Sequence, residues 1–468
     1  MNIAEEIFLR ADPQAVAVIE KGVSWTYGDL DRRSQEISEE LPSKGVKATR
    51  PLIGLRGPDG MNYLALALGI LRSGACLVPL AVELSPAERE ALVATLALDA
   101  VITVDTTADP LNLFSLEKVE NKKLLECWEA LEELNPAFIR FSSGTTGAAK
   151  GIVLSHEALR DRIEAANSGL KIGPEDRILW VLSMAHHFVV SILLYLWNGA
   201  AVVLPETHLP GDILAAGRDH HATVFYAAPC HYIFLTSGNE ECAWPSLRLA
   251  VSTSAPLQPE TAAQFSSRFG VPPIQALGIM EVGLPFLNNS DPVTRCASVG
   301  TPQAGFQVQI RDAEGNQVRE GEHGELFLKG PGMFDAYVAP WRTREEVTRP
   351  DGWFSTGDIA TEDSGGFITI IGRSKTVINV GGMKFFPEEV ELVLCSHPEV
   401  LEARVVGIPH PIFGWVPVAE VVKSPQGALT PYTLVSLCRK QLARYKLPVE
   451  IRFVETIPRT PSGKISRI

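Results

Sequence analysis

The run FSSGTTGAAKG, Phe141 to Gly151, is the part of the sequence best suited to chemistry on an anion. It holds three glycines, two serines, two threonines and one lysine in eleven positions. Backbone amides, hydroxyls and a cation together can surround an anionic group. The nucleotide-binding P-loop is excluded, because that motif needs glycine directly before the lysine and Ser or Thr directly after it. Lys150 instead lies between Ala149 and Gly151. A polar surface loop is the alternative interpretation.

Four further motifs follow this run in order. They are GIMEVG at 278–283, FSTGDIA at 354–360, GRSKTVINVGGMKFFPEEVE at 372–391 and PRTPSGK at 458–464. The order and spacing of the five motifs resemble those of the adenylate-forming superfamily, which includes acyl- and aryl-CoA ligases, luciferases and peptide-synthetase adenylation domains. The resemblance covers essentially the whole chain, although each motif alone would be weak.

The resemblance implies an ATP-dependent acid–thiol ligase. In this chemistry a carboxylate attacks the α-phosphate of ATP, which gives acyl-AMP and pyrophosphate, and a thiol then displaces AMP to form a thioester. Negative charge concentrates in the first step, so amides, hydroxyls, Mg²⁺ and lysine are needed around the phosphates. The implied partners are a small carboxylic acid and either CoA or the phosphopantetheine of an acyl or aryl carrier protein.

The resemblance also assigns roles to the residues that contact the phosphates. Thr145 and Thr146 would donate hydroxyl hydrogen bonds to the β- and γ-phosphates, Lys150 would add positive charge, and Glu281 would hold Mg²⁺. Thr145 and Glu281 would therefore be catalytic, together with Lys464. The remaining predicted contacts to ATP or AMP are Ser142, Ser143, Gly144, Gly147, Ser254, Ala255, Leu277, Gly278, Met280, Asp358 and Arg373.

Three of these residues have specific implied functions at the nucleotide. Asp358 would accept hydrogen bonds from both ribose hydroxyls, and Arg373 would approach the nucleotide at the domain border. Lys464 would bridge the substrate carboxylate and the α-phosphate. A turn residue is the alternative for Asp358, and a solvated side chain is the alternative for Lys464.

The step that uses the thiol is assigned to the C-terminal part of the chain. Lys375 matches the position about which the C-terminal domain rotates between the two half-reactions. Gly381 and Gly382 would line the channel for the thiol, since glycine lets a pantetheine arm pass. An ordinary turn is the alternative for this glycine pair.

Three positions depart from the family pattern. Leu277 replaces a tyrosine that covers adenine, Met280 replaces a threonine that bonds a phosphate, and Ala149 replaces a proline of the loop. Leu277 can still cover adenine by dispersion, but a methionine cannot donate a hydroxyl hydrogen bond. A hydrogen bond of that kind contributes about 1.5–3 kcal/mol when one partner is charged. The departures put catalytic efficiency in doubt rather than nucleotide binding.

The segment SMAHHFVVSI, 183–192, falls where family members line the acyl pocket. It resembles enzymes that adenylate hydroxybenzoates, and it has no Asp to hold an α-amino group, so an aryl acid is favoured over an amino acid. The predicted pocket residues are His186, His187, Tyr226, Val299 and Gly300. Both histidines could instead be core residues. A medium- or long-chain fatty acid stays open, because Gly283, Leu284 and Val299 are small or apolar.

The elements that position these residues follow an α/β pattern in a chain of 468 residues, which is long enough for two or more domains. Short apolar strands alternate with amphipathic helices up to about residue 296, which indicates layered, largely parallel sheets. Close-spaced strands at about 297–371 predict a small β-barrel or sandwich. We therefore predict an N-terminal adenylation domain at 1–371, followed by a small, mobile α+β domain at 372–468.

Composition narrows the possible partners and compartment. The net charge of −13 argues against nucleic acid. Residues 373–468 nevertheless carry 13 basic and 8 acidic residues, so this module is basic and suits phosphate-bearing partners. Seven cysteines without a CxxC pair favour a reducing compartment. No secretory signal is evident, and Asn198 and Gly199 interrupt the longest apolar run, so we expect a cytoplasmic protein without a membrane span.

Two other classes of protein remain alternatives. A non-catalytic relative could bind adenylates as a sensor, given Leu277 and Met280, although Lys464, Glu281 and Lys150 are all present. A luciferase-like oxygenase shares every motif.

Overall fold

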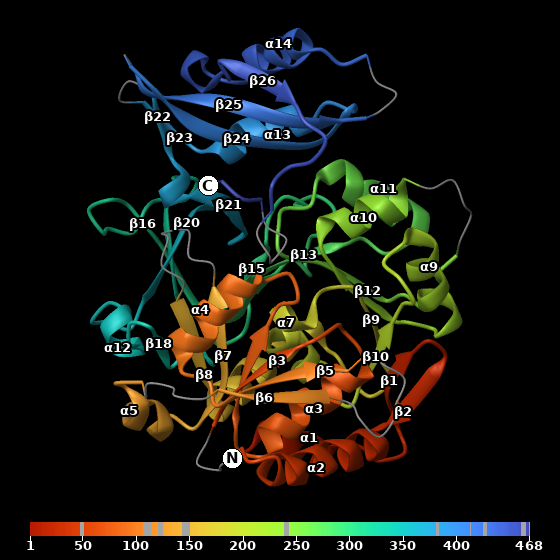
Figure 1. Cartoon of the computed structure of the whole chain (residues 1–468). Coiled ribbons are helices and arrows are strands. Elements are labelled where there is room, and N and C mark those ends of the chain that lie inside the picture. Colours follow the sequence, from red (N-terminus) through yellow and green to blue (C-terminus); the bar gives the residue numbers. More distant parts are fainter. Residues whose placement is uncertain are drawn as a thin grey trace. The chain divides into compact units, whose positions relative to one another are not determined.

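The structure of the chain is a computed structural model. It describes residues 1–46, 51–105, 114–119, 125–142, 150–237, 243–380, 383–411, 413–424, 428–459 and 465–467. The chain forms two compact units: unit 1 is Met1–Gln307 with Leu328–Phe354, and unit 2 is Val308–Phe327 with Ser355–Ile468. The predicted mixed α/β class is confirmed (Figure 1). The predicted boundary between residues 371 and 372 stays a prediction.

Among the described residues, unit 1 contains a nine-stranded sheet that is parallel through its centre. Its strands in spatial order are β15 (Thr301–Pro302), β14 (Gly283–Leu287), β13 (Ile274–Ile279), β12 (Leu249–Ser252), β11 (Val224–Ala227), β9 (Arg177–Trp180), β10 (Ala201–Leu204), β1 (Val16–Glu20) and β2 (Val23–Thr26). The central strands are apolar and buried on both faces, as expected for parallel strands covered by helices.

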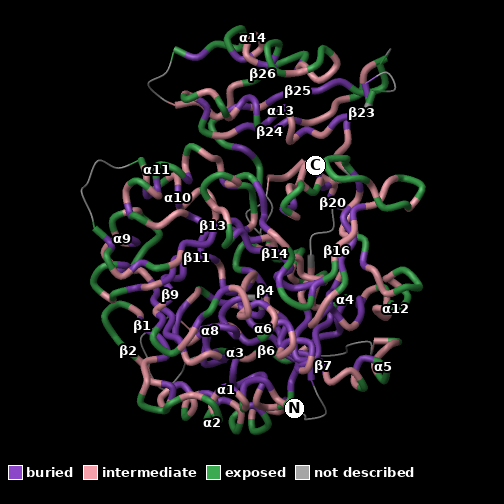
Figure 2. The backbone as a smooth tube through the Cα atoms, turned by 180° about the vertical axis from the view of Figure 1, so that it is seen from behind, coloured by how far each residue is buried: buried purple, intermediate pink, exposed green. Residues whose placement is uncertain are grey.

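A second sheet of unit 1 has eight strands within the described ranges. In spatial order these are β19 (Arg342–Thr343), β18 (Ala336–Val338), β8 (Lys150–Ser155), β7 (Pro136–Ser142), β4 (Cys76–Leu80), β3 (Leu52–Arg56), β5 (Ala100–Val104) and β6 (Phe114–Lys118). Strands β3, β4, β5 and β7 run parallel, whereas β8 and β18 pair in antiparallel fashion. Figure 2 shows the strands of both large sheets as mostly buried.

Helices cover these sheets, and several begin at caps that the sequence encodes. Thr26 with Asp29 and Ser85 with Glu88 form capping boxes, in which each side chain bonds the backbone N–H of the other residue. The helices of unit 1 are α1 (Ile3–Arg10), α2 (Tyr27–Ser43), α3 (Met61–Arg72), α4 (Pro86–Leu96), α5 (Trp128–Glu133), α6 (His156–Leu170), α7 (Met184–His187), the π-turn η1 (Phe188–Ile192), α8 (Leu193–Trp197), α9 (Pro210–Asp219), α10 (Pro229–Thr236), α11 (Pro259–Phe269) and α12 (Arg344–Val347). Figure 1 shows α9, α10 and α11 beside the first sheet.

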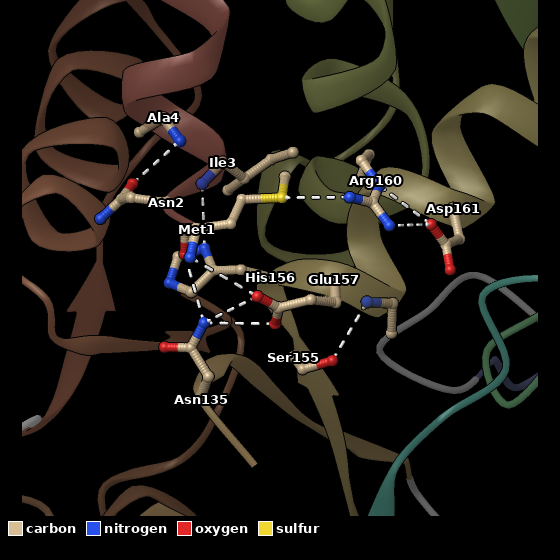
Figure 3. A network of polar contacts seen from close by, with 11 residues as sticks. Met1, Asn2, Ile3, Ala4, Asn135, Ser155, His156, Glu157, Arg160 and Asp161 are labelled. Carbon is tan, nitrogen blue, oxygen red and sulfur yellow. Dashed lines mark hydrogen bonds and ion pairs between the residues drawn. The ribbon is translucent and has the colours of Figure 1, made fainter. Parts of the chain in front are cut away.

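The N-terminus of α6 is fixed by a polar network (Figure 3). The backbone N–H of Ile3 donates to His156 Nδ1 over 3.1 Å, and Asn135 Nδ2 donates to the carboxylate of Glu157 over 3.2 Å. The N–H of Ser155 donates to Asp335 Oδ2 over 2.6 Å. These bonds anchor α6 and the end of β8, which both carry residues of the candidate site.

Unit 2 contains most of the strands of two smaller sheets. The first has the order β16 (Gln307–Arg311), β17 (Gly324–Lys329), β20 (Phe354–Glu362) and β21 (Ile368–Arg373); the second has β23 (Met383–Phe385), β22 (Ile378–Val380), β25 (Gly414–Lys423) and β24 (Val400–His410), with β26 (Glu450–Phe453) paired to β25. The helices are η2 (Ser374–Thr376), α13 (Pro387–Cys395), α14 (Pro431–Gln441) and η3 (Arg444–Lys446). The segment predicted to be a barrel, 297–371, thus supplies the first of these sheets and also edge strands of both large sheets.

The apolar run at 188–204 forms η1, α8, a turn at Asn198–Gly199 and β10, and most of its described side chains are buried. None of the helices in the described ranges combines the length and the apolar character that a membrane crossing requires.

Candidate active site

Three of four neighbouring parallel strands of the first sheet end at or near predicted site residues. The strands β13, β12, β11 and β9 are adjacent and parallel, so their carboxyl ends lie at one edge. Leu277 and Gly278 lie near the end of β13, Ser254 follows β12, and Tyr226 is near the end of β11. In open α/β sheets this edge is where ligands bind. The fold therefore gathers the predicted adenine and acyl contacts of unit 1.

The backbone at this edge has two unusual conformations. Ser254 has φ +75°, which a non-glycine residue rarely adopts. Gly300 has φ +96°, and an added Cβ would lie 2.2 Å from Leu287 O, so only glycine fits beside that carbonyl. Ala255 is exposed, and Val299 is buried at 9% exposure. The assigned roles of these residues in the nucleotide site and the acyl pocket stay predictions.

A second group of site residues is set by the register of β7, β8 and β18. Arg140 pairs with Ile152, and Ile152 pairs with Tyr337, so these three side chains project from one face of the sheet. Lys150 lies two residues before Ile152 on β8 and shares this face. Strands β7 and β8 flank residues 143–149 in the sequence, so two cations and a tyrosine lie beside the ends of the predicted phosphate-binding run.

Tyr337 contacts both Lys150 and Glu281. Its hydroxyl donates to Glu281 Oε1 over 2.9 Å, and Lys150 Nζ lies 4.9 Å from the centre of its ring. The ring face attracts the ammonium group by a cation–π interaction. Burial, and secondarily the charge of Glu281, raise the pKa of Tyr337 well above its usual range, so it stays a hydrogen-bond donor. Tyr337 thereby links Lys150, the predicted phosphate contact, to Glu281, the predicted magnesium ligand.

The segment that carries Glu281 is fixed by its main chain. The N–H of Phe334 donates to Glu281 O over 2.8 Å, and Arg162 Nη1 donates to Met280 O over 3.1 Å. Arg162 also donates to Gly332 O from Nε over 3.0 Å and from Nη2 over 2.6 Å. Gly332 has φ +65°, and an added Cβ would lie 2.4 Å from Arg162 N. Burial lowers the pKa of Arg162 to about 10, so it stays charged at neutral pH.

Glu281 fits the magnesium role that the resemblance implies. Oε1 accepts the hydrogen bond from Tyr337, and the carboxylate is half-buried rather than enclosed, so its oxygens can still coordinate a cation. No group of three His, Cys, Asp or Glu side chains suited to a metal exists in the described ranges. Mg²⁺ is commonly bound through one or two carboxylates together with substrate phosphates. A single glutamate therefore suits an ion that is bound with the nucleotide.

Helix α7, which carries His186 and His187, is held at both ends. Asp59 Oδ1 accepts from Met184 N over 2.8 Å, and Arg140 Nη1 donates to His186 O. Arg140 Nη2 lies 3.5 Å from His186 Nδ1. Burial raises the pKa of Asp59 to about 6 and lowers the pKa of Arg140 to about 10. His186 therefore lies in direct contact with Arg140, on the sheet face that also carries Lys150 and Tyr337.

His187 lies against a cluster of buried aromatic rings. The ring of Trp180 is 6.0 Å from that of His187, 5.9 Å from that of Tyr195 and 6.1 Å from that of Tyr226, with which it is stacked. Trp180 and Tyr195 are each 1% exposed. His187 and Tyr226, which were both predicted to line the acyl pocket, thus share Trp180 as a neighbour.

The two predicted nucleotide residues of unit 2 form an ion pair. Asp358 on β20 lies directly opposite Arg373 on β21, and Arg373 Nε is 2.6 Å from Asp358 Oδ1. The N–H of Asp358 donates to Thr356 Oγ1 over 3.0 Å. The Asp358 side chain is 5% exposed and that of Arg373 is 43% exposed. The ion pair with Arg373 fixes the carboxylate of Asp358, which is predicted to accept hydrogen bonds from the ribose.

Some predicted residues lie outside the described part of the chain. These are Ser143, Gly144, Thr145, Thr146, Gly147, Gly381, Gly382 and Lys464, together with the side chains of Ser142 and Lys375. Their assigned roles stay predictions.

Sequence reasoning missed Arg140, Arg162, Tyr337, Trp180 and Tyr195. Arg140 left one signal, because it is a charged residue inside the apolar strand sequence PAFIRFS. Nothing in the sequence marks Tyr337, because its neighbours are set by strand register.

Comparisons with known proteins identify the family of the chain. Residues 6–338 match the model of the AMP-binding enzyme family, and residues 389–464 match that of the AMP-binding enzyme C-terminal domain. The sulfoacetate–CoA ligase of Cupriavidus necator is 35% identical over 71% of this chain and 66% of its own length. The feruloyl-CoA synthase of an Amycolatopsis species is 27% identical over 97% of this chain and 95% of its own length. The crystal structure of ATP-bound MatB from Rhodopseudomonas palustris superposes with a TM-score of 0.87 at 24% identity, covering 99% of this chain and 97% of that one.

The chain belongs to the AMP-binding enzyme family, because the family model matches more than half of it. The predicted membership of the adenylate-forming superfamily is confirmed. The chain spans slightly less than two thirds of the sulfoacetate–CoA ligase, and nearly all of the feruloyl-CoA synthase.

Proposed function

We propose that the chain is an ATP-dependent acid–thiol ligase. It activates a carboxylic acid as acyl-AMP with release of pyrophosphate, and it then transfers the acyl group to CoA or to a carrier-protein pantetheine. The observation that carries the proposal is the contact of Tyr337 with both Lys150 and Glu281. A cation for phosphate oxygens and a carboxylate for Mg²⁺ are the groups that the adenylation step needs.

In this proposal the described residues orient the nucleotide and hold charge. Lys150 attracts phosphate oxygens, Glu281 supplies an oxygen to Mg²⁺, and Asp358 accepts hydrogen bonds from the ribose. Mg²⁺ supplies positive charge to the phosphates when bound. The residues outside the described ranges keep their assigned roles, with Lys464 at the α-phosphate.

We propose an aryl acid as the preferred substrate. Trp180, Tyr195 and Tyr226 form a buried, rigid aromatic cluster against His187, and such a wall suits a short, flat acid. A long alkyl chain needs an extended channel, and these large rings are packed against one another there. The name of the feruloyl-CoA synthase, which matches 97% of the chain, supports the same class. A fatty acid is the competing class, because a long-chain-fatty-acid–CoA ligase of Yersinia pestis is 32% identical over 71% of the chain.

The test is exchange of labelled pyrophosphate into ATP with a panel of acids, followed by thioester analysis with CoA or with carrier protein. We expect acid-dependent exchange and, in the presence of a thiol acceptor, a thioester together with AMP. Absence of exchange with every acid class would contradict the proposal. Exchange without a thioester would support the adenylation step and contradict the proposed transfer to CoA or a carrier protein.

A further inference from the structure

Arg140 is a partly exposed arginine whose hydrogen bonds use little of its capacity. The guanidinium has five N–H donors. In the described part of the chain its polar contacts all go to His186: Nη1 donates to the carbonyl oxygen, and Nη2 lies 3.5 Å from the ring nitrogen. Among the described residues the polar contacts of Arg140 include no carboxylate, and the charge of Glu281 acts on it without a hydrogen bond. A guanidinium that is half-buried in this way is normally paired with a carboxylate or held by several hydrogen-bond acceptors.

Arg162 shows how the same unit satisfies an arginine that has a structural function. Arg162 is 3% exposed, and its three hydrogen bonds go to the main-chain oxygens of Gly332 and Met280. Asp335 and Glu281 both act on its charge. Arg140 has fewer acceptors than Arg162 and greater exposure. The difference indicates that Arg140 has capacity for a further anionic partner.

The position of Arg140 shows which partner fits. It shares a sheet face with Lys150 and Tyr337, and it lies two residues before Ser142, where β7 ends. Glu281 acts electrostatically on it, and His186 is its neighbour. Arg140 therefore lies among the groups that are assigned to phosphate, metal and acid. An arginine fork binds two oxygens of a carboxylate or phosphate at once.

We propose that Arg140 is an anion-binding residue of the active site, and that its guanidinium binds the oxyanion oxygens of a reactant. The inference rests on the proposed function. Its placement beside Lys150 favours the polyphosphate of ATP as the source of these oxygens. Met280 lacks the hydroxyl with which the family pattern bonds a phosphate, so the polyphosphate has one donor fewer there. A second acidic group on the carboxylic acid presents the same chemistry, and the experiment below distinguishes the two.

The experiment compares Arg140→Gln, Arg140→Lys and the control Arg177→Gln. Arg177 also donates one hydrogen bond to a main-chain oxygen, His220 O at 2.9 Å, but it begins β9 and lies outside the site. Binding of ATP, AMP and inorganic pyrophosphate is measured by calorimetry without acid, so the result does not depend on turnover. KM values are then measured for acids with one and with two anionic groups, and thermal midpoints report folding.

If Arg140 binds the polyphosphate, Arg140→Gln weakens ATP and pyrophosphate binding about 10- to 100-fold, leaves AMP binding unchanged, and Arg140→Lys restores part of the loss. If it binds the acid, nucleotide binding is unchanged and KM rises only for acids with two anionic groups. Unchanged binding in both series would overturn the proposal. So would an equal rise in KM for all acids with a lowered thermal midpoint, because that result identifies Arg140 as a structural support of α7. Wild-type protein that binds ATP but activates no acid would contradict the proposed function and leave this test intact.

Discussion

Replacing Tyr337 with phenylalanine should selectively impair the adenylation half-reaction. The substitution removes the 2.9 Å hydrogen bond to Glu281 but keeps the ring over which Lys150 lies at 4.9 Å. A hydrogen bond to a charged group contributes about 1.5–3 kcal/mol, which corresponds to roughly 10- to 150-fold in rate or affinity. We therefore expect the kcat/KM for ATP in pyrophosphate exchange to fall by about tenfold or more, and the Mg²⁺ concentration for half-maximal rate to rise.

A second substitution separates the two contacts of this side chain. Tyr337→Leu removes the hydrogen bond and also the cation–π interaction, which contributes about 0.5–2 kcal/mol. Its adenylation rate should therefore lie below that of Tyr337→Phe. Thioester formation from preformed acyl-AMP should stay near the wild-type rate in both variants, because that half-reaction uses no triphosphate.

The matched control is Tyr27→Phe. Tyr27 is buried, and its hydroxyl donates to Ala200 O over 2.8 Å and lies 3.2 Å from Leu196 O, elsewhere in unit 1. This variant should lose about 1 kcal/mol of stability without a change in the KM for ATP or in the Mg²⁺ dependence. The reasoning is refuted if Tyr337→Phe behaves like wild type or like the control, or if it slows both half-reactions equally.

Four other predictions follow from the sequence and the structure. Lys464→Ala should reduce acyl-AMP formation by orders of magnitude and spare thioester formation from preformed acyl-AMP; equal loss in both, measured by rapid quench, would contradict its assigned role. Rising salt should slow the thioester step more than pyrophosphate exchange, because residues 373–468 carry 13 basic and 8 acidic residues and should attract an anionic acceptor; parallel salt dependences would count against this. Benzoate-like acids should support exchange better than decanoate, and His187→Ala should weaken hydroxylated benzoates most, by several-fold to about tenfold; a preference for decanoate with an unchanged ranking would identify a fatty-acid ligase. Asp59→Asn should stabilise the protein more at pH 7.5 than at pH 5, by about 1.4 kcal/mol. The reason is that burial raises the Asp59 pKa to about 6, so the stability present with the protonated acid is lost as pH rises through that value. An equal shift of the urea midpoint at both pH values would contradict this cause.

The motifs predicted the family, because its chemistry lies within short segments, and the site residues that they assign stay predictions. Lys150 and Glu281 could be assigned from the runs that contain them, and the structure connects them through Tyr337. The pairing of Asp358 with Arg373 depends on the register of β20 and β21, so the sequence predicted both residues without predicting their ion pair.

Arg140 and Tyr337 could not be predicted for the same reason. They are far apart in the sequence, and they share a sheet face because β7 pairs with β8 and β8 pairs with β18. Long-range pairing of this kind is decided by the packing of whole sheets rather than by local pattern. The aromatic cluster around Trp180 likewise joins β9, β11 and α8, which local motifs do not relate.

The central claim is that the carboxylate of the acid attacks the α-phosphate of ATP. The most direct measurement uses an aryl acid whose carboxylate oxygens are isotopically heavy, with ATP, Mg²⁺ and CoA, and determines the mass of the AMP formed. We expect AMP that carries one heavy oxygen, because the bridging oxygen of acyl-AMP leaves with AMP when the thiol attacks the carbonyl carbon. AMP without heavy oxygen, or ADP and phosphate in place of AMP, would contradict it.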